Sequence, residues 1–316
     1  MDKRDYNYAL VVNKFQNGLE YLANGIVHIP SKDLNKKLNI KYGEEKGQRY
    51  DLIYPQSKEK LPIMFYIHGE GFVSGTLALR RPYCYSLAKE GFFVVNIDYR
   101  LAPKTQFPEQ FNDIFKVIEM IYDKAEEYNI DTSRVAVAGE SAGGYFANYL
   151  GVLSKKKELF EKLNIKFKYI EEFDVKSTLL INGIYEIKNV SAIKALNCQT
   201  FIKSFYNLSR EEFKKINEIN NDLFSSCTYL DSTYPPSIVL RGNHDVYDDA
   251  SKQITELFDE KKVEYSTYCT KGLSGLHGFV IAPINKEGKR AFKYTTENLK
   301  RYLGWLILKK SKKYLL

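Results

Sequence analysis

Gly139-Glu140-Ser141-Ala142-Gly143-Gly144 is the stretch that decides the fold of this 316-residue chain. It follows a short apolar run at residues 135–138, which predicts a buried strand, and it precedes a predicted helix at residues 145–153. A serine in the pattern G-x-S-x-G between a strand and a helix indicates a sharp turn with a strained serine backbone. Glycines are expected on either side of the serine because the chain passes too close to itself there for a Cβ atom. Such a turn lifts the Ser141 hydroxyl clear of the sheet, at the positive end of the helix that follows.

The rest of the chain alternates between predicted strands and predicted helices. Strands are expected at residues 63–67, 92–97, 135–138 and 175–181, and helices at residues 80–89 and 108–128. This alternation predicts an α/β fold with a mostly parallel central sheet and helices on both faces. Residues 185–230 break the pattern, and we expect them to form a helical cap together with the amphipathic residues 1–25. The sequence therefore predicts a single domain over residues 1–316 that carries this cap, with a final helix at residues 291–308.

Two later loops carry residues that complement Ser141. Asp245 follows the apolar run 237–240, and His277 lies beyond the strand-like residues 263–268. Both are loop positions past strand ends, where open α/β sheets build their sites, and the order serine, acid, histidine is that of α/β hydrolases. A serine hydroxyl is a weak nucleophile unless an adjacent imidazole takes its proton. We therefore predict His277 as the base and Asp245 as the acid that orients it.

The apolar run 63–67 ends in His68-Gly69-Glu70-Gly71, which is close to the HGGG-type loop that supplies backbone N–H groups to an oxyanion. We predict that the N–H groups of Glu70, Gly71 and Ala142 are these donors, Ala142 because it follows the nucleophile. Glu70 stands where the pattern has glycine, which tolerates a positive φ more easily. Its carboxylate would also repel a nearby oxyanion. We expect either that this side chain points into solvent or substrate space, or that activity is low.

Together these motifs resemble those of the hormone-sensitive-lipase-like esterases, a family of α/β hydrolases. The resemblance extends over further stretches: Asp98-Tyr99-Arg100-Leu101-Ala102-Pro103, Phe107-Pro108 with Asp113, Gly242 to Asp245 with Asp248, and His277-Gly278-Phe279. It runs from about residue 42 to the C-terminus and departs from the family pattern at Glu70 and at Lys104. It implies the α/β-hydrolase fold with a helical cap and the hydrolysis of small, short-acyl carboxylic esters through an acyl-enzyme.

Other residues could take parts of these roles. His244 stays a competing base because it neighbours Asp245, whereas His28 is expected to be structural and His68 to shape the oxyanion loop. Asp248 and Asp249 are alternative acids, although we expect them to cap a helix that begins near Ala250. Asp98 and Glu140 are interpreted as supporting residues. The aromatic side chains of the predicted cap either line a pocket or pack the cap onto the body; these are Tyr185, Phe201, Phe205, Tyr206 and Phe213.

Composition narrows the class of protein further. The chain carries a net charge of +8, but its lysines are spread and no nucleic-acid-binding motif is visible, so we expect no nucleic-acid partner. No run of 18 apolar residues and no secretory signal are seen, so we expect no membrane span and a cytoplasmic location. The four cysteines are widely spaced, and we expect no metal and no other cofactor. The expected partner is a small-molecule ester, and a homodimer stays open.

Two alternatives to an esterase remain on the same fold. A peptidase or amidase would have to protonate a poorer leaving group, and an exopeptidase would also need a charged anchor for the peptide terminus. A non-catalytic small-molecule receptor would be expected to have lost a member of the serine, acid and histidine set. This chain keeps all three, and only Glu70 favours the receptor.

Overall fold

The computed structural model describes residues 1–11, 29–186, 198–216, 218, 222–278, 281 and 285–305. His28 lies outside these residues, as do most of the predicted N-terminal helix and the C-terminal part of the predicted last helix. Of the residues expected in the N-terminal helix, 3–11 are helical.

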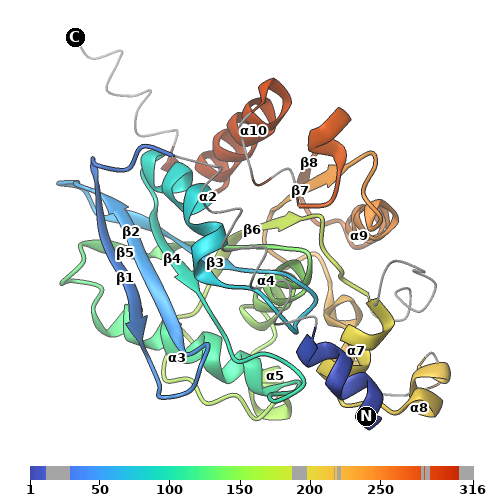
Figure 1. The fold of residues 1–316 in the computed structure, drawn as a ribbon. Helices are drawn as coiled ribbons and strands as arrows, with labels where there is room; N and C mark the ends of the chain where they lie inside the picture. Colours follow the sequence, from blue (N-terminus) through green and yellow to red (C-terminus); the bar gives the residue numbers. More distant parts are fainter. Residues whose placement is uncertain are drawn as a thin grey trace.

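An eight-stranded sheet with the order β1-β2-β4-β3-β5-β6-β7-β8 forms the centre of the molecule (Figure 1). Its strands are β1 (Leu34–Lys41), β2 (Arg49–Pro55), β3 (Leu61–Ile67), β4 (Phe93–Ile97), β5 (Ile130–Glu140), β6 (Val175–Ile181), β7 (Ser237–Gly242) and β8 (Tyr265–Thr270). β1 and β2 are antiparallel to their neighbours, whereas every pair from β4 to β8 is parallel. The carboxyl ends of six strands therefore meet at one edge, and the predicted α/β fold is confirmed.

Helices cover both faces of the sheet. α2 (Leu77–Lys89) and α10 (Lys286–Tyr302) pack on one face, while α3 (Glu109–Asp123), α4 (Ala142–Leu153) and α9 (Asp248–Lys261) pack on the other. Successive side chains of a strand point to opposite faces, so a strand covered on both sides is apolar throughout. β3 shows this directly: Met64 and Tyr66 join the core under α2 and α10, and Phe65 joins the core under α3 and α4.

The boundaries of the last helix differ from those predicted. α10 begins at Lys286 because Asn285 caps it, its side-chain oxygen accepting a hydrogen bond from the Gly288 N–H at 2.7 Å. The helix ends at Tyr302, six residues before the predicted end, although residues 303–308 continue the apolar pattern. The hydrophobic pattern alone therefore located the helix but neither of its ends.

Short helices lie beyond the carboxyl edge of the sheet. They are α7 (Cys198–Tyr206), α8 (Arg210–Lys214), η1 (Asp222–Phe224) and η2 (Ser226–Tyr229), and helical residues 3–11 lie beside α7 and α8 (Figure 1). Lys203 of α7 forms a buried ion pair with Asp5 at 2.6 Å, and Arg210 lies 3.2 Å from Asp2. The N-terminal helix and the segment from 198 to 214 thus form one layer. Their role as a cap stays a prediction.

Aromatic stacking joins this layer to the body. The ring of Phe205 is fully buried and stacks on Phe72 with a centroid distance of 4.0 Å and an interplanar angle of 12°. Tyr206 donates a hydrogen bond to the hydroxyl of Tyr145 at 2.8 Å. Of the five aromatic residues expected in the cap, only Phe201 is more than slightly exposed. For Phe205, Tyr206 and Phe213 the packing interpretation therefore holds, whereas buried Tyr185 also lines a cavity described below.

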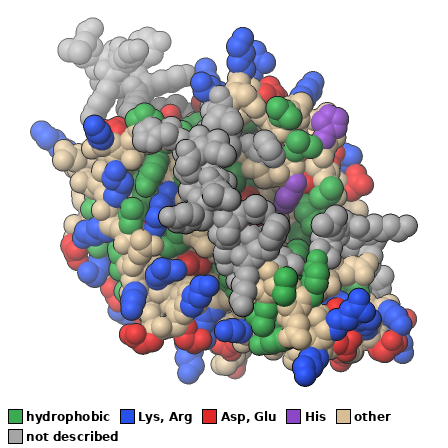
Figure 2. All heavy atoms as spheres, in the orientation of Figure 1, with side chains coloured by type: hydrophobic (Ala, Val, Ile, Leu, Met, Phe, Trp, Pro, Cys, Tyr) green, Lys and Arg blue, Asp and Glu red, His purple; other side chains and the backbone are tan. Residues whose placement is uncertain are grey.

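The charged side chains on one face of the molecule do not gather into a single basic patch. Figure 2 shows Lys and Arg side chains distributed among acidic, polar and apolar ones. This agrees with the spread of lysines along the sequence.

Replacing Phe205 with Ala should remove the central ring of the contact between α7 and the body. We expect the free energy of unfolding to fall by about 3–5 kcal/mol, the usual range for a buried Phe, in urea denaturation followed by circular dichroism. Tyr8→Ala, at a position that is 39% exposed, is the control and should change the stability by about 0.5 kcal/mol or less. Equal losses in the two variants would show that the stack contributes little.

Candidate active site

Ser141 occupies a sharp turn between β5 and α4, with φ 54° and ψ −120°. A Cβ atom on Gly139 would lie 2.9 Å from the backbone N of Gly144, and one on Gly143 would lie 2.8 Å from the carbonyl oxygen of His68. Real Cβ atoms do not approach backbone so closely, so both positions require glycine. The Ser141 N–H donates to the carbonyl of Ile181 at 2.9 Å, which ties the turn to the neighbouring strand β6.

The structure brings the three predicted residues from the loops after β5, β7 and β8 into one hydrogen-bonded series. Nε2 of His277 lies 3.1 Å from Oγ of Ser141, and Nδ1 lies 3.0 Å from Oδ1 of Asp245. Ser141 and Asp245 are each 8% exposed, whereas the His277 side chain is 33% exposed. The acid is thus shielded from water, and one side of the imidazole remains accessible.

Asp245 is held by two further residues that sequence reasoning missed. The Tyr247 N–H donates to its Oδ1 at 2.8 Å, and the side-chain amide of Asn182 donates to its Oδ2. The Tyr247 ring also packs edge-on against the His277 ring, with centroids 4.9 Å apart. Asn182 follows β6 directly and has φ 45°, a conformation that Asn tolerates better than most residues. An Asn-Gly pair at the end of a parallel strand was the available signal.

The competing candidates lie elsewhere. His244 is exposed, and its Nε2 lies 3.2 Å from the Asn243 amide nitrogen. Asp248 pairs with Arg241 at 2.6 Å. Asp248 and Asp249 both lie in the first turn of α9, which begins at Asp248 with Tyr247 as its N-cap residue, so the expectation that they cap a helix starting near Ala250 is wrong.

His68 lies where the oxyanion loop begins. It is fully buried, stacks on Tyr99 with a centroid distance of 4.5 Å, and places Nε2 3.1 Å from Oδ1 of Asp98. Burial works against the protonated imidazole, but the hydrogen bond with Asp98 and the charge of that carboxylate outweigh it and raise the pKa of His68. The imidazole is thus held by Asp98 and Tyr99 and is not placed to act as the catalytic base. It instead fixes the first residue of the oxyanion loop.

The oxyanion loop rests directly against the serine turn. A Cβ on Gly69 would lie 2.9 Å from the Cβ of Ser141, so the contact exists only because residue 69 is glycine. The next three residues all have positive φ, 70° at Glu70, 65° at Gly71 and 67° at Phe72. Glu70 therefore adopts the left-handed angle that the family glycine would favour.

The Glu70 side chain does not point into solvent, which was one of the expected directions. It is 16% exposed, and its Oε1 accepts a hydrogen bond from Nη2 of Arg80 on α2 at 2.9 Å. The carboxylate is thus bound within the protein by a cation and does not point into solvent.

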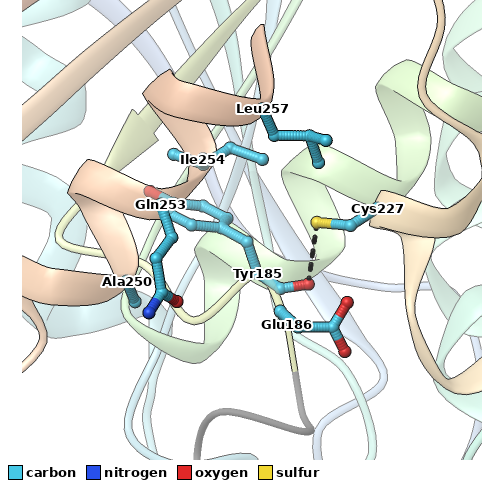
Figure 3. Close-up of a pocket in the computed structure, with 7 residues that line it drawn as sticks. All are labelled: Tyr185, Glu186, Cys227, Ala250, Gln253, Ile254 and Leu257. Carbon is cyan, nitrogen blue, oxygen red and sulfur yellow. Dashed lines mark hydrogen bonds between the residues drawn. The ribbon is translucent and has the colours of Figure 1, made fainter. Parts of the chain in front are cut away.

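A cavity of about 120 Å³ lies next to the loop that follows β6 (Figure 3). Its walls come from that loop, from η2 and from one face of α9: Tyr185, Glu186, Cys227, Ala250, Gln253, Ile254 and Leu257. The Cys227 thiol donates to the Tyr185 carbonyl at 3.4 Å, and burial raises the pKa of this thiol. The loop also touches the serine turn, because the Ile184 N–H donates to the Ser141 carbonyl at 3.3 Å.

Within the described residues, no group of three or more His, Cys, Asp or Glu side chains is arranged to hold a metal ion. Across the same residues, no helix has both the length and the apolar character needed to cross a membrane.

Comparison with known proteins places the chain in a family. The family model described as BD-FAE matches residues 50–258, and the chain belongs to this family. An ethyl acetate hydrolase from Pseudomonas putida is 37% identical over 98 residues, covering 30% of this chain and 31% of that protein. An acetyl esterase from Salmonella schwarzengrund is 25% identical over 228 residues, covering 68% of this chain and 66% of that protein. The chain thus spans from about a third to about two thirds of the length of the curated relatives it matches.

The fold is shared with solved esterases. An inhibited esterase B from Lactobacillus rhamnosis superimposes with a TM-score of 0.83 over 98% of this chain and 100% of that chain, at 18% identity. A hyperthermophilic esterase from Pyrobaculum calidifontis gives 0.71 over 95% of this chain and 91% of that chain, at 22% identity. The predicted α/β-hydrolase fold is confirmed by these likenesses.

The close approach at the serine turn gives a direct test of the geometry. In Gly143→Ala the new methyl group would meet backbone atoms of β3 and of the residue after it, which cannot move aside. We expect the free energy of unfolding to fall by about 3 kcal/mol or more in urea denaturation. Gly43→Ala is the matched control, because its methyl group meets only the movable side chain of Gln48, and it should lose about 1 kcal/mol or less. A Gly143→Ala protein as stable as the unchanged protein would contradict the close approach of the serine turn to the backbone at the end of β3.

Proposed function

We propose that this protein is a serine carboxylesterase that hydrolyses small, short-acyl esters through an acyl-enzyme. The observation that carries the proposal is the unbroken hydrogen-bonded series from the Ser141 hydroxyl through His277 to the shielded carboxylate of Asp245. The esterases among the relatives and the structural neighbours support the same class of reaction.

The first half of the proposed reaction acylates the serine. Nε2 of His277 accepts the Ser141 proton as Oγ attacks the ester carbonyl, and the charge of Asp245 stabilises the imidazolium that forms. When the tetrahedral intermediate collapses, the same nitrogen returns the proton to the departing alcohol. A water molecule then takes the place of the alcohol, His277 activates it, and attack on the acyl-enzyme releases the acid and restores Ser141.

Negative charge develops on the carbonyl oxygen in both tetrahedral intermediates. We assign the backbone N–H groups of Glu70, Gly71 and Ala142 as its donors, because the loop that holds the first two rests on the turn that holds the third. Ala142 is also the first residue of α4, a helix whose amino end favours negative charge.

We base the proposed preference for short acyl groups on the crowding of side chains beside the oxyanion loop. A Cβ on Gly71 would lie 3.0 Å from ring atoms of Phe201, so the α7 side chain sits directly on the loop. We propose that Phe201, presented by the cap, limits the space for the substrate. The ethyl acetate hydrolase and the acetyl esterase among the relatives, whose names specify acetyl groups, support this proposal.

Ser141→Ala tests the function. Turnover of 4-nitrophenyl acetate and butyrate should fall by about 10⁴-fold or more, to the level left when a triad member is lost, while the circular dichroism spectrum stays unchanged. Ser133→Ala, at an exposed serine outside the site, should retain the activity of the unchanged protein. Undiminished turnover by Ser141→Ala would end the proposal.

Asn182→Gly tests the support of the acid. Glycine accepts the positive φ of residue 182, so the substitution removes the hydrogen bond to Asp245 without imposing backbone strain. Hydrogen bonds to charged groups contribute about 1.5–3 kcal/mol, so kcat/KM should fall by about 10- to 100-fold in steady-state assays. Asn164→Gly, a left-handed Asn away from the site, controls for the added chain entropy and should keep full activity.

A further inference from the structure

A single guanidinium joins the two halves of the proposed oxyanion hole. Arg80 projects from α2, with its side chain only 10% exposed. Its Nη2 donates to Glu70 of the oxyanion loop at 2.9 Å, and its Nε donates to Oε1 of Glu140, the residue directly before Ser141. The planar guanidinium presents several donors in a fixed geometry, which suits it to bonding two carboxylates from one position.

The second carboxylate is fully engaged in holding the loop. Oε1 of Glu140 also accepts from the Gly69 N–H at 2.8 Å, and its Oε2 accepts from the Tyr66 hydroxyl at 2.6 Å. Glu140 therefore fixes the backbone one residue before the first proposed donor. Arg80 is the cation in contact with both carboxylates. Burial disfavours the charged guanidinium, but the negative charges of Glu140 and Glu70 favour it more strongly, so the pKa of Arg80 is raised.

Glu70 brings a charge problem that a glycine at this position would not. Its N–H is a proposed donor to the oxyanion, yet the same residue carries a carboxylate of the same sign as that oxyanion. Like charges repel strongly where water is excluded, so the position of the carboxylate decides whether the hole can work. In the structure the side chain is drawn to α2, and its charge is paired there.

We propose that Arg80 is a positioning residue for catalysis: by binding the Glu70 carboxylate at α2, it keeps that charge off the oxyanion and makes a hole with Glu at this position competent. This inference rests on the proposed esterase function. When residue 70 is glycine, no side chain brings negative charge near the oxyanion. With glutamate at this position, the ion pair with Arg80 keeps the charge away instead.

Glu70→Asp and Glu70→Asn form the sharpest test, because the two variants have the same shape and differ in charge. Both shorten the side chain by one methylene group, so neither reaches Arg80 as Glu70 does, and both residues tolerate positive φ. With 4-nitrophenyl acetate, kcat of Glu70→Asp should be about 10- to 100-fold below that of Glu70→Asn, while the KM values of the two variants should agree within about threefold. Equal kcat values for the two variants would overturn the proposal.

Removing the cation gives the reciprocal test. Arg80→Met should lower kcat per active site by about 10-fold or more, and adding Glu70→Gln to it should restore most of that loss. Arg81→Met is the matched control: Arg81 is the next residue on α2 and pairs with the buried carboxylate of Asp51 at 2.9 Å, so its loss should lower stability but leave kcat unchanged. Active sites are counted by titration with an organophosphonate, which separates lost folding from lost catalysis.

The outcomes distinguish this inference from the function on which it rests. If the unchanged protein does not hydrolyse the ester, the proposed function fails and the role of Arg80 falls with it. If the unchanged protein is active and Arg80→Met matches it per titrated site, or if Glu70→Gln gives no rescue, only the role of Arg80 is refuted. Should Arg80→Met fail to fold, the pair of variants at residue 70 decides, because both retain the bond between Arg80 and Glu140.

Discussion

The contact between the serine turn and the oxyanion loop is the constraint on which the rest of the site depends. β3 and β5 are neighbouring parallel strands, with Ile67 paired to Gly139, so the loops that follow them leave the sheet side by side. The loops touch because Gly69 and Gly143 carry no Cβ atoms, and any side chain at either position would meet backbone. This approach sets the distance between the nucleophile and the groups proposed to stabilise its oxyanion. The histidine and its acid are then added from strands further along the same edge.

Buried charge surrounds this contact, and each charged group has a specific partner. Glu140 and Glu70 share Arg80, His68 bonds Asp98, and Asp245 accepts from Asn182 and from the backbone of Tyr247. Buried ion pairs often add little net stability, because desolvation offsets their attraction, but losing one partner is strongly destabilising. We therefore interpret these pairs as holding the loops in register. The departure at residue 70 fits the same logic, because an added charge is matched by a cation from a neighbouring helix.

Much of the site could be predicted from the sequence, because its parts have local signatures. The turn at Ser141 shows its glycines, and Asp245 and His277 follow strand-like runs in the order this fold requires. Asn182 and Arg80 were missed because their importance arises only when distant segments meet. Nothing local distinguishes Arg80 from Arg81, yet one faces the proposed hole and the other faces Asp51 on β2. The direction of the Glu70 side chain was undecidable for the same reason, since its partner lies on a different element.

The helix boundaries show a second kind of limit. Periodicity located α3 and α10, but α3 ends at Asp123, where the prediction ran to residue 128, and α10 begins five residues before the predicted start. In both cases the apolar pattern marked the buried face, while caps and turns set the ends; Asn129, at φ 50°, lies in the turn that leads into β5. Tertiary packing thus decided what local propensity left open.

The most direct test of the active site is to locate the covalent bond. The protein is incubated with a short-chain alkyl phosphonate ester that carries a 4-nitrophenyl leaving group, digested and mapped by mass spectrometry. One equivalent of nitrophenol should be released per chain, and the phosphonyl group should be found on Ser141 alone. A label on another residue, or no label while ester hydrolysis continues at full rate, would contradict the assignment of Ser141 as the nucleophile.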